Sequence, residues 1–239
     1  MSDEFWSAVR GVTPARIGLG RFGDGVATAE LLAFGAAHAA ARDAIHAPMA
    51  VEPLLADLET LGLGTAAVVR SAADDRAIYL RRPDLGRIPG GELPTGAGCD
   101  LAIVLADGLS AEAVECHAVA LIRELLPLLG AITVGTPVVA LQARVALGDH
   151  IGRALGAEAV LVLIGERPGL SASDSLGAYL TWDPRPGIAD SARNCVSNIR
   201  TPNGLDPTTA ARTVAALLAG ARELGATGVR LKDTSHILD

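Results

Sequence analysis

One segment of the sequence constrains the fold more than any other: residues 157–164, AEAVLVLI, form the most apolar run in the chain. A short continuous run of this kind is typical of a strand that is buried on both faces of a parallel sheet. The run ends abruptly in GERPG, at 165–169. Because open α/β sheets bind ligands beyond the carboxyl ends of their strands, this charged segment is the first place to look for a functional site.

Apolar strands alternate with helical segments from residue 65 onward. Strands are predicted at 65–70, 76–80, 100–106, 137–142, 157–164 and 176–182, the last as an edge strand. Helices are predicted at 110–129, 145–156 and 208–224, the first with Ser110 as its N-cap. The segment RNCVSNIR, at 193–200, reads as a polar loop. The alternation predicts an α/β fold with a Rossmann-like, mostly parallel sheet and helices on both faces.

The part of the chain that precedes this alternation is predicted to be helical. Helical segments are predicted at 27–46 and from Val51 to Leu61, and glycines follow the second. We therefore expect a small helical N-terminal region at 1–63, which serves for partner contact, and a Rossmann-like domain at 64–239.

Composition excludes several classes of function. The chain of 239 residues has 20 Lys and Arg against 27 Asp and Glu, a net charge of −7, and only 3% aromatic residues. Such a chain lacks the basic surplus and the stacking residues that bind nucleic acids. No apolar run reaches the length of a membrane span. The three cysteines Cys99, Cys116 and Cys195 form neither a C-x-x-C pair nor a disulfide framework. We expect an intracellular, soluble protein without a metal site.

A glycine-rich motif, GLGRFG at 18–23, has the spacing of a dinucleotide-binding loop. That function requires a buried strand directly before the loop, and the preceding segment is short and interrupted by Pro14. A glycine turn that lets a helix or a partner approach closely is the favoured interpretation.

The polar residues at the ends of the predicted strands are candidates for binding. Asp107, Gln142 and Glu166 each follow a strand, so we expect them near one crevice. Glu166 either pairs with Arg167 on the surface or accepts hydrogen bonds from a polar ligand, and the residues alone leave both readings open. Cys195 has no nearby histidine to activate it as a nucleophile. The crevice is thus suited to holding a ligand rather than to proton or acyl transfer.

Several longer segments resemble one known family, the small (light) subunit of ethanolamine ammonia-lyase. They follow one another over most of the chain: TPARIGLGRFG (13–23), AAHAAARDAIH (36–46), YLRRPDLGR (79–87), DLAIVLADGLSAEAV (100–114), QARVALGDHIG (142–152), VLIGERPGLSASDSLGAYLTW (162–182), RNCVSNIR (193–200) and GVRLKD (228–233).

This resemblance implies a carbon–nitrogen lyase that uses adenosylcobalamin to convert ethanolamine to acetaldehyde and ammonia. It implies a hetero-oligomer in which a large (heavy) subunit, a TIM-type barrel, holds the substrate and the small subunit completes the cobalamin site. The family's cobalamin-binding positions correspond to Val145, Glu166 and Cys195. The resemblance also implies a cytoplasmic enzyme, in some hosts enclosed in a bacterial microcompartment. The competing interpretations are a stand-alone nucleotide-dependent oxidoreductase that uses residues 16–23 and a non-catalytic scaffold subunit.

Overall fold

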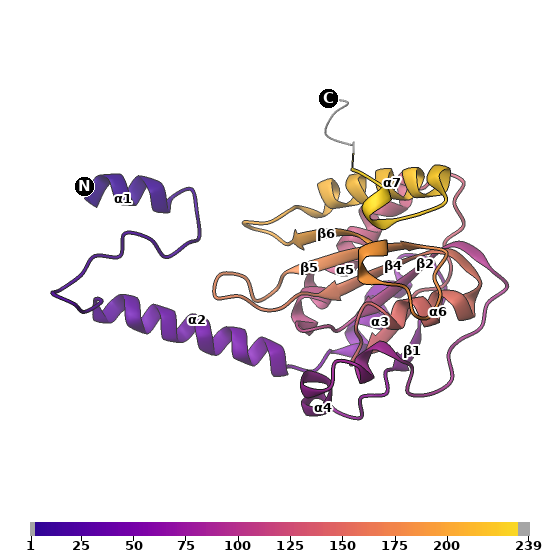
Figure 1. Ribbon diagram of the computed structural model, residues 1–239, viewed down its shortest axis with the longest axis horizontal. Helices are drawn as coiled ribbons and strands as arrows, with labels where there is room; N and C mark the ends of the chain where they lie inside the picture. Colours follow the sequence, from indigo (N-terminus) through magenta and orange to yellow (C-terminus); the bar gives the residue numbers. More distant parts are fainter. Residues whose placement is uncertain (1–2, 234–239) are drawn as a thin grey trace.

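A six-stranded sheet forms the centre of the protein in the computed structural model, which describes residues 3–233 (Figure 1). The strand order is β1-β3-β2-β4-β5-β6. The strands are β1 Ala67–Arg70, β2 Cys99–Ala106, β3 Val138–Leu141, β4 Ala157–Gly165, β5 Leu176–Trp182 and β6 Asn194–Ile199. The helices are α1 Asp3–Arg10, α2 Thr28–His46, α3 Val51–Glu59, α4 Arg76–Arg81, α5 Ala111–Leu125, α6 Leu147–Leu155 and α7 Pro207–Leu224, with short 3-10 turns η1 Leu85–Arg87 and η3 Asp190–Ala192 among the connections.

The predicted fold class is confirmed. Strands β1, β3, β2 and β4 pair in parallel, whereas β5 pairs antiparallel with β4 and with β6. The chain runs from β2 back to β3 and then past β2 to β4. The connections after β2 and β3 therefore leave in opposite directions, which opens a crevice at the carboxyl ends of these strands.

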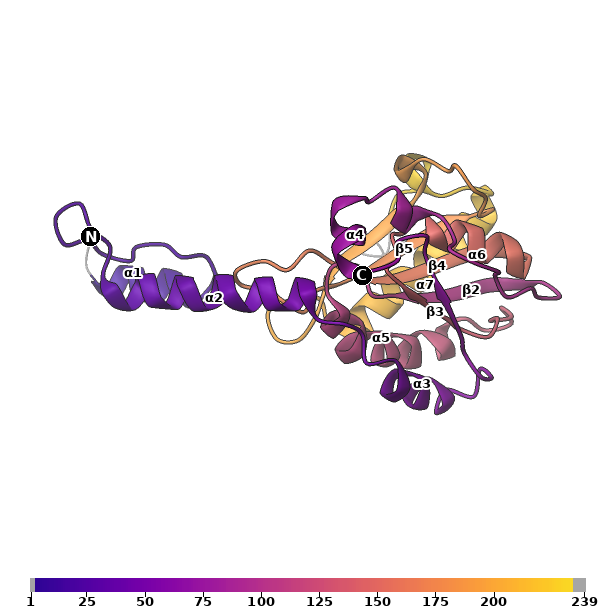
Figure 2. The ribbon, with the colours of Figure 1, turned by 90° about the horizontal axis from the view of Figure 1, so that it is seen from below.

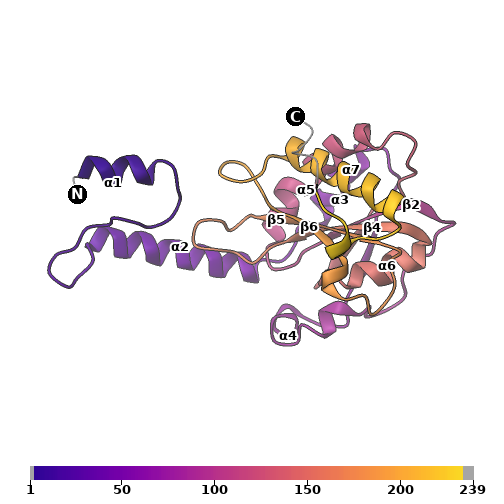
Figure 3. The ribbon, with the colours of Figure 1, turned by 45° about the horizontal axis from the view of Figure 1, so that its top comes forward.

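Alternate side chains of each inner strand enter one of two cores. In β2, Leu101, Ile103 and Leu105 pack with α3, α5 and α7 on one face, and Ala102 and Val104 pack with α6 on the other. Figure 3 shows α5 and α7 on one side of the sheet and α6 on the opposite side. Ser110 caps α5 as predicted, since its Oγ accepts a hydrogen bond from the backbone N–H of Ala113.

Two predictions for the outer strands are wrong. The segment 193–200 is a strand, β6, over Asn194–Ile199 and not a loop, and 176–182 is consequently an inner strand and not an edge strand. The polar appearance of β6 arises because it is itself the edge: Val196 and Ile199 are buried, and the residues between them are exposed.

The predicted strand at 76–80 is also wrong, because these residues form helix α4. Asp75 lies at the N-cap position, where its side chain accepts a hydrogen bond from the backbone N–H of Ile78. An N-cap of this kind stabilises the first turn of a helix. The capping signal therefore outweighs the β propensity of the apolar residues that follow Asp75.

Helices α1 and α2 form an arm that projects from the rest of the protein (Figures 1 and 2). Ala41 and Ala44, near the end of α2, are buried, whereas most of α2 is exposed. Leu54 and Leu58 of α3 belong to the main core. The domain division between residues 63 and 64 stays a prediction, and residues 1–2 and 234–239 lie outside the described part of the chain. Within residues 3–233, no helix combines the length and the hydropathy that a membrane span requires.

Candidate functional site

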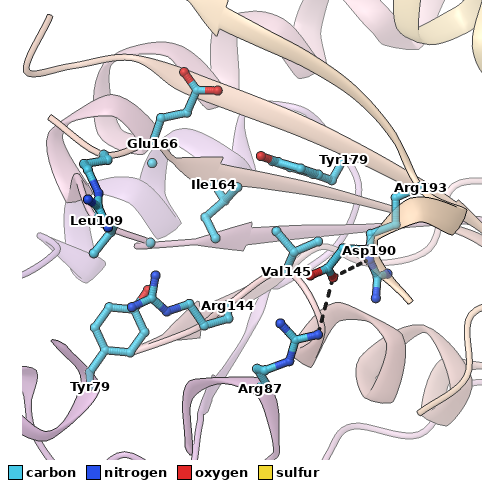
Figure 4. A pocket seen from close by; sticks show the side chains of 13 residues that line it. Tyr79, Arg87, Leu109, Arg144, Val145, Ile164, Glu166, Tyr179, Asp190 and Arg193 are labelled. Atoms are coloured by element: carbon cyan, nitrogen blue, oxygen red, sulfur yellow. Dashed lines mark hydrogen bonds and ion pairs between the residues drawn. The ribbon is translucent and has the colours of Figure 1, made fainter. Parts of the chain in front are cut away.

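A cavity of about 590 Å³ lies beyond the carboxyl ends of β2, β3 and β4 (Figure 4). Three connecting segments line it: Gly108 and Leu109 after β2, Arg144 and Val145 after β3, and 165–167 at the end of β4. These are the loops that we expected to share one edge of the sheet. The cavity thus occupies the crevice that the topology predicts.

Glycines allow two of these loops to lie in contact. A Cβ atom on Gly165 would lie 1.9 Å from the carbonyl oxygen of Ser110, and one on Gly108 would lie 2.2 Å from the carbonyl oxygen of Gly165. The backbone N–H of Leu109 donates a 2.9 Å hydrogen bond to the same Gly165 oxygen. The two strand ends can therefore approach this closely only without side chains at these positions.

A buried carboxylate joins two of the loops. Asp107 accepts hydrogen bonds from the backbone N–H groups of Gln142, at 2.9 Å, and Ala143, at 3.0 Å. Burial raises the pKa of Asp107, although these bonds and the nearby Arg76 favour its charged form. Asp107 and Gln142 lie at the crevice as expected, but they fix the loops together and are not among the residues that line the cavity.

Glu166 lines the cavity at the end of β4 and is half-buried. Its Oε2 accepts a 2.6 Å hydrogen bond from the hydroxyl of Ser175 and a 3.2 Å bond from the backbone N–H of Asn198. Among the described residues, Glu166 makes no ion pair with Arg167. The structure therefore does not support a surface ion pair between Glu166 and Arg167. The other carboxylate oxygen of Glu166, Oε1, remains available to accept a hydrogen bond.

The other two predicted positions lie around the same cavity. Val145 lines it directly before α6. Cys195 is exposed on β6 and pairs across the sheet with Tyr179 of β5, whose ring lines the cavity. Partial burial, with the neighbouring Cys195 and Glu166, raises the pKa of Tyr179 above its usual range, so its hydroxyl remains protonated. The structure thus brings Val145 and Glu166 to one cavity and places Cys195 beside it.

Sequence reasoning missed Arg87, Arg144 and Arg193 at this site, and also the tyrosine beneath Arg144. The guanidinium of Arg144 lies 4.4 Å from the ring centre of Tyr79, whose hydroxyl donates a 2.9 Å hydrogen bond to the carbonyl of Ala143. On another side of the cavity, Asp190 joins Arg87, at 3.3 Å, to Arg193, at 3.5 Å (Figure 4). Arg144 follows a predicted strand end just as Glu166 does, and that position was the available signal.

The chemistry of the cavity is that of a binding site. Among the described residues that line it there is no histidine, cysteine or serine, so it does not hold the Ser–His or Cys–His pair of those nucleophilic enzymes. It combines hydrogen-bond donors and acceptors with apolar walls from Leu109, Val145 and Ile164. Within residues 3–233, no cluster of side chains is arranged to hold a metal ion.

The glycine-rich segment at 18–23 lies apart from this cavity, in the arm between α1 and α2. No strand precedes it among the described residues, so it lacks the setting of a dinucleotide-binding loop. A Cβ atom on Gly18 would lie 2.3 Å from the ring of Trp6 in α1. The interpretation as a turn that lets a helix approach closely is confirmed.

Comparisons with known proteins give a consistent result over the whole chain. Residues 3–232 match the family model described as "Ethanolamine ammonia-lyase light chain (EutC)". The chain is 55% identical to the ethanolamine ammonia-lyase small subunit of Bradyrhizobium diazoefficiens, over 95% of this chain and 90% of that protein. It is 50% identical to the protein of the same name from Rhodococcus erythropolis, over 98% of this chain and 91% of that protein. The corresponding protein of Azotobacter vinelandii is 48% identical, over 97% of this chain and 89% of its own length.

Proposed function

The chain belongs to the ethanolamine ammonia-lyase light-chain family, and on that premise we propose that it is the small subunit of an adenosylcobalamin-dependent ethanolamine ammonia-lyase. In this proposal it completes the cofactor site of a large subunit that binds ethanolamine. The observation that carries the proposal is the match over nearly the full chain, together with the cavity at the strand ends where Val145 and Glu166 meet. When bound, the cofactor supplies the radical chemistry that converts ethanolamine to acetaldehyde and ammonia.

The residues of the cavity fit such a group. Cobalamin carries neutral amide side chains, ribose hydroxyls and one phosphate around an apolar ring edge. The free Oε1 of Glu166 can accept a hydrogen bond from an amide or a hydroxyl, and the protonated phenol of Tyr179 can donate one. Val145 and Ile164 offer apolar surface for packing. In this arrangement Cys195 contributes contact beside Tyr179 and not nucleophilic chemistry.

The size of the cavity indicates a shared site. Cavities of about 300–1,000 Å³ enclose drug-sized ligands, and this one measures about 590 Å³. A corrinoid is larger than such a ligand, so this chain can enclose only part of it. We propose that the large subunit covers the rest, so that this chain forms one half of a cofactor site.

The surface of the arm supports contact with a large partner. Phe22 is 80% exposed and Leu32 is 68% exposed, and the other exposed large apolar residues of the arm are Phe5, Val12, Val26, Leu31 and Phe34. Soluble monomers rarely expose this much apolar surface in one region. We propose that the large subunit covers it in a hetero-oligomer that works in the cytoplasm, within a bacterial microcompartment in hosts that form one.

Reconstitution tests the proposed function. The chain is co-expressed with a large subunit of ethanolamine ammonia-lyase, and acetaldehyde formation from ethanolamine is measured with and without adenosylcobalamin. We expect activity only with both chains and the cofactor. Activity of this chain alone with a nicotinamide cofactor would instead favour the oxidoreductase interpretation. A complex in which substitutions around the cavity leave cobalamin affinity unchanged would favour a scaffold.

Substitution of Glu166 tests the assigned cofactor contact. Glu166→Ala is expected to weaken cobalamin binding by the assembled complex about tenfold or more, because a hydrogen bond to a charged group contributes roughly 1.5–3 kcal/mol. The measurement is an absorbance titration of the complex. Glu158→Ala is the matched control, since Glu158 is an exposed carboxylate at the other end of β4. Equal affinities for the two variants would remove Glu166 from the site.

A further inference from the structure

Arg144 lines the cavity and has no carboxylate partner among the described residues. It is half-buried, and its Nε is buried without a hydrogen-bond partner among the described residues. Its two terminal nitrogens donate to no carboxylate either, since Arg144 makes no ion pair within residues 3–233. A partly desolvated guanidinium with free donors is an unfavourable arrangement unless an anion binds to it.

The other charged groups at the cavity are already satisfied or solvated. Arg87 and Arg193 share Asp190, and Arg193 also binds the buried Asp149. Glu166 is held by Ser175 and Asn198. Arg167, which also lines the cavity, is exposed to solvent. Arg144 is therefore the group whose charge the fold leaves uncompensated in a sheltered position.

The position of Arg144 is fixed before any ligand arrives. Its guanidinium lies over the ring of Tyr79, at 4.4 Å, and its backbone N–H donates a 2.8 Å hydrogen bond to the carbonyl of Gly86. A Cβ atom on Gly86 would lie 2.9 Å from Cγ of Arg144 and 2.8 Å from the Tyr79 ring. The side chain is thus clamped between a ring and a glycine, which lowers the entropy lost when it binds a ligand.

The surroundings favour an anion at this place. The guanidinium of Arg76 also lies over the Tyr79 ring, at 5.0 Å, but the buried Asp107, 3.5 Å away, compensates its charge. Helix α6 begins three residues after Arg144, and the N-terminus of a helix favours negative charge. Figure 4 shows the Glu166 carboxylate pointing away from Arg144, so the cavity has one side that accepts hydrogen bonds and another that is cationic.

We propose that Arg144 binds a phosphate group and that this phosphate is the diester in the nucleotide tail of the cofactor. This inference rests on the proposed function and deepens it, because it assigns the two sides of the cavity to different parts of one ligand. Glu166 accepts from neutral donors, and Arg144 binds the single anionic group. A planar guanidinium matches the oxygens of a phosphate better than an ammonium does.

A comparison of two corrinoids tests the proposal. Complexes of the large subunit with the wild-type chain or with Arg144→Met are titrated with cobalamin and with cobinamide, which has the corrin ring but lacks the nucleotide and its phosphodiester. We expect Arg144→Met to bind cobalamin about 10- to 100-fold more weakly and cobinamide with its affinity unchanged. Methionine preserves a long side chain over Tyr79, and thermal unfolding confirms that the variant is folded.

Arg153→Met is the control for net charge. Arg153 is exposed in the last turn of α6, outside the cavity, so its loss is expected to leave both affinities unchanged. Arg144→Lys, which keeps the charge but not the planar group, is expected to recover part of the cobalamin affinity. Such a recovery would also exclude a purely structural role of Arg144, because a positive charge alone would not repair a structural defect.

The remaining outcomes separate the sources of the anion. Equal weakening of cobalamin and cobinamide binding in Arg144→Met, or no weakening of either, overturns the proposal. If inorganic phosphate changes cobinamide binding only when Arg144 is present, while cobalamin affinity does not depend on Arg144, the site binds a free anion and the proposal is wrong. A wild-type complex that binds neither corrinoid overturns the proposed function itself, which distinguishes the two failures.

Discussion

Replacement of Asp149 by alanine is expected to lower the free energy of unfolding by about 3–5 kcal/mol, because it removes the buried counter-charge of Arg193. The carboxylate that remains near Arg193 is that of Asp190, which is exposed and lies 3.5 Å away. The Arg193 side chain is 2% exposed and that of Asp149 is 1% exposed. The two groups form paired hydrogen bonds of 2.5 Å and 2.7 Å. Arg193 also donates to the hydroxyl of Thr181 and the carbonyl of Ile188, but neither acceptor neutralises its charge.

A double substitution separates the loss of the pair from the loss of volume. Asp149→Ala with Arg193→Met removes both charges, and we expect it to be more stable than Asp149→Ala alone. The measurement is denaturant unfolding of the purified protein with both single variants and the double variant. If the double variant loses as much stability as the two single variants together, the ion pair is not the cause of the effect.

This ion pair also connects stability to the candidate site. Asp149 lies in α6, and Arg193 lies directly before β6, the strand that carries Cys195 and Asn198. The pair therefore anchors an edge strand to the helix on one face of the sheet. Since Asn198 donates to Glu166, displacement of β6 would also disturb the carboxylate that we assign to the cofactor.

The fold was largely predictable because its inner strands and capped helices carry strong local signals. The apolar run that became β4 and the Ser110 cap of α5 each point to one structure. Strand β6 was missed because an edge strand needs only alternate apolar residues, and this one also contains Asn198 with a φ of 58°. Helix α4 was missed because the apolar residues of 76–80 were assigned to a strand and the capping role of Asp75 was not considered.

The site was predictable only where a residue stands at a strand end. That rule pointed to Glu166, and the family resemblance added Val145 and Cys195. The strand-end rule could not reveal the contact between Arg87 and Asp190, because these residues lie 103 positions apart in sequence. Nor could it show that Arg144 stacks on Tyr79, since the two are brought together by the tertiary fold and the segment of Tyr79 was assigned to a strand.

Substitution of Gly165 by alanine is expected to damage the site, because the added methyl group would overlap backbone atoms of the loop after β2. The added Cβ would lie 1.9 Å from the oxygen and 2.6 Å from the carbon of the Ser110 carbonyl, and 2.8 Å from the oxygen of Asp107. These are backbone atoms, so no side-chain rotation relieves the clash. The loop after β2 must move away from the end of β4, and the hydrogen bond from Leu109 to Gly165 is lost.

The effect should appear both in stability and in function. Overpacking of this kind costs about 1–3 kcal/mol, and a displacement of about 1 Å at a binding site can lower turnover about 100-fold. Thermal unfolding and acetaldehyde formation by the assembled enzyme measure the two effects. Gly91→Ala is the control, because a Cβ atom there meets nothing within 4 Å. Normal turnover and cobalamin affinity in Gly165→Ala would mean that the contact between the two strand ends does not shape the cofactor site.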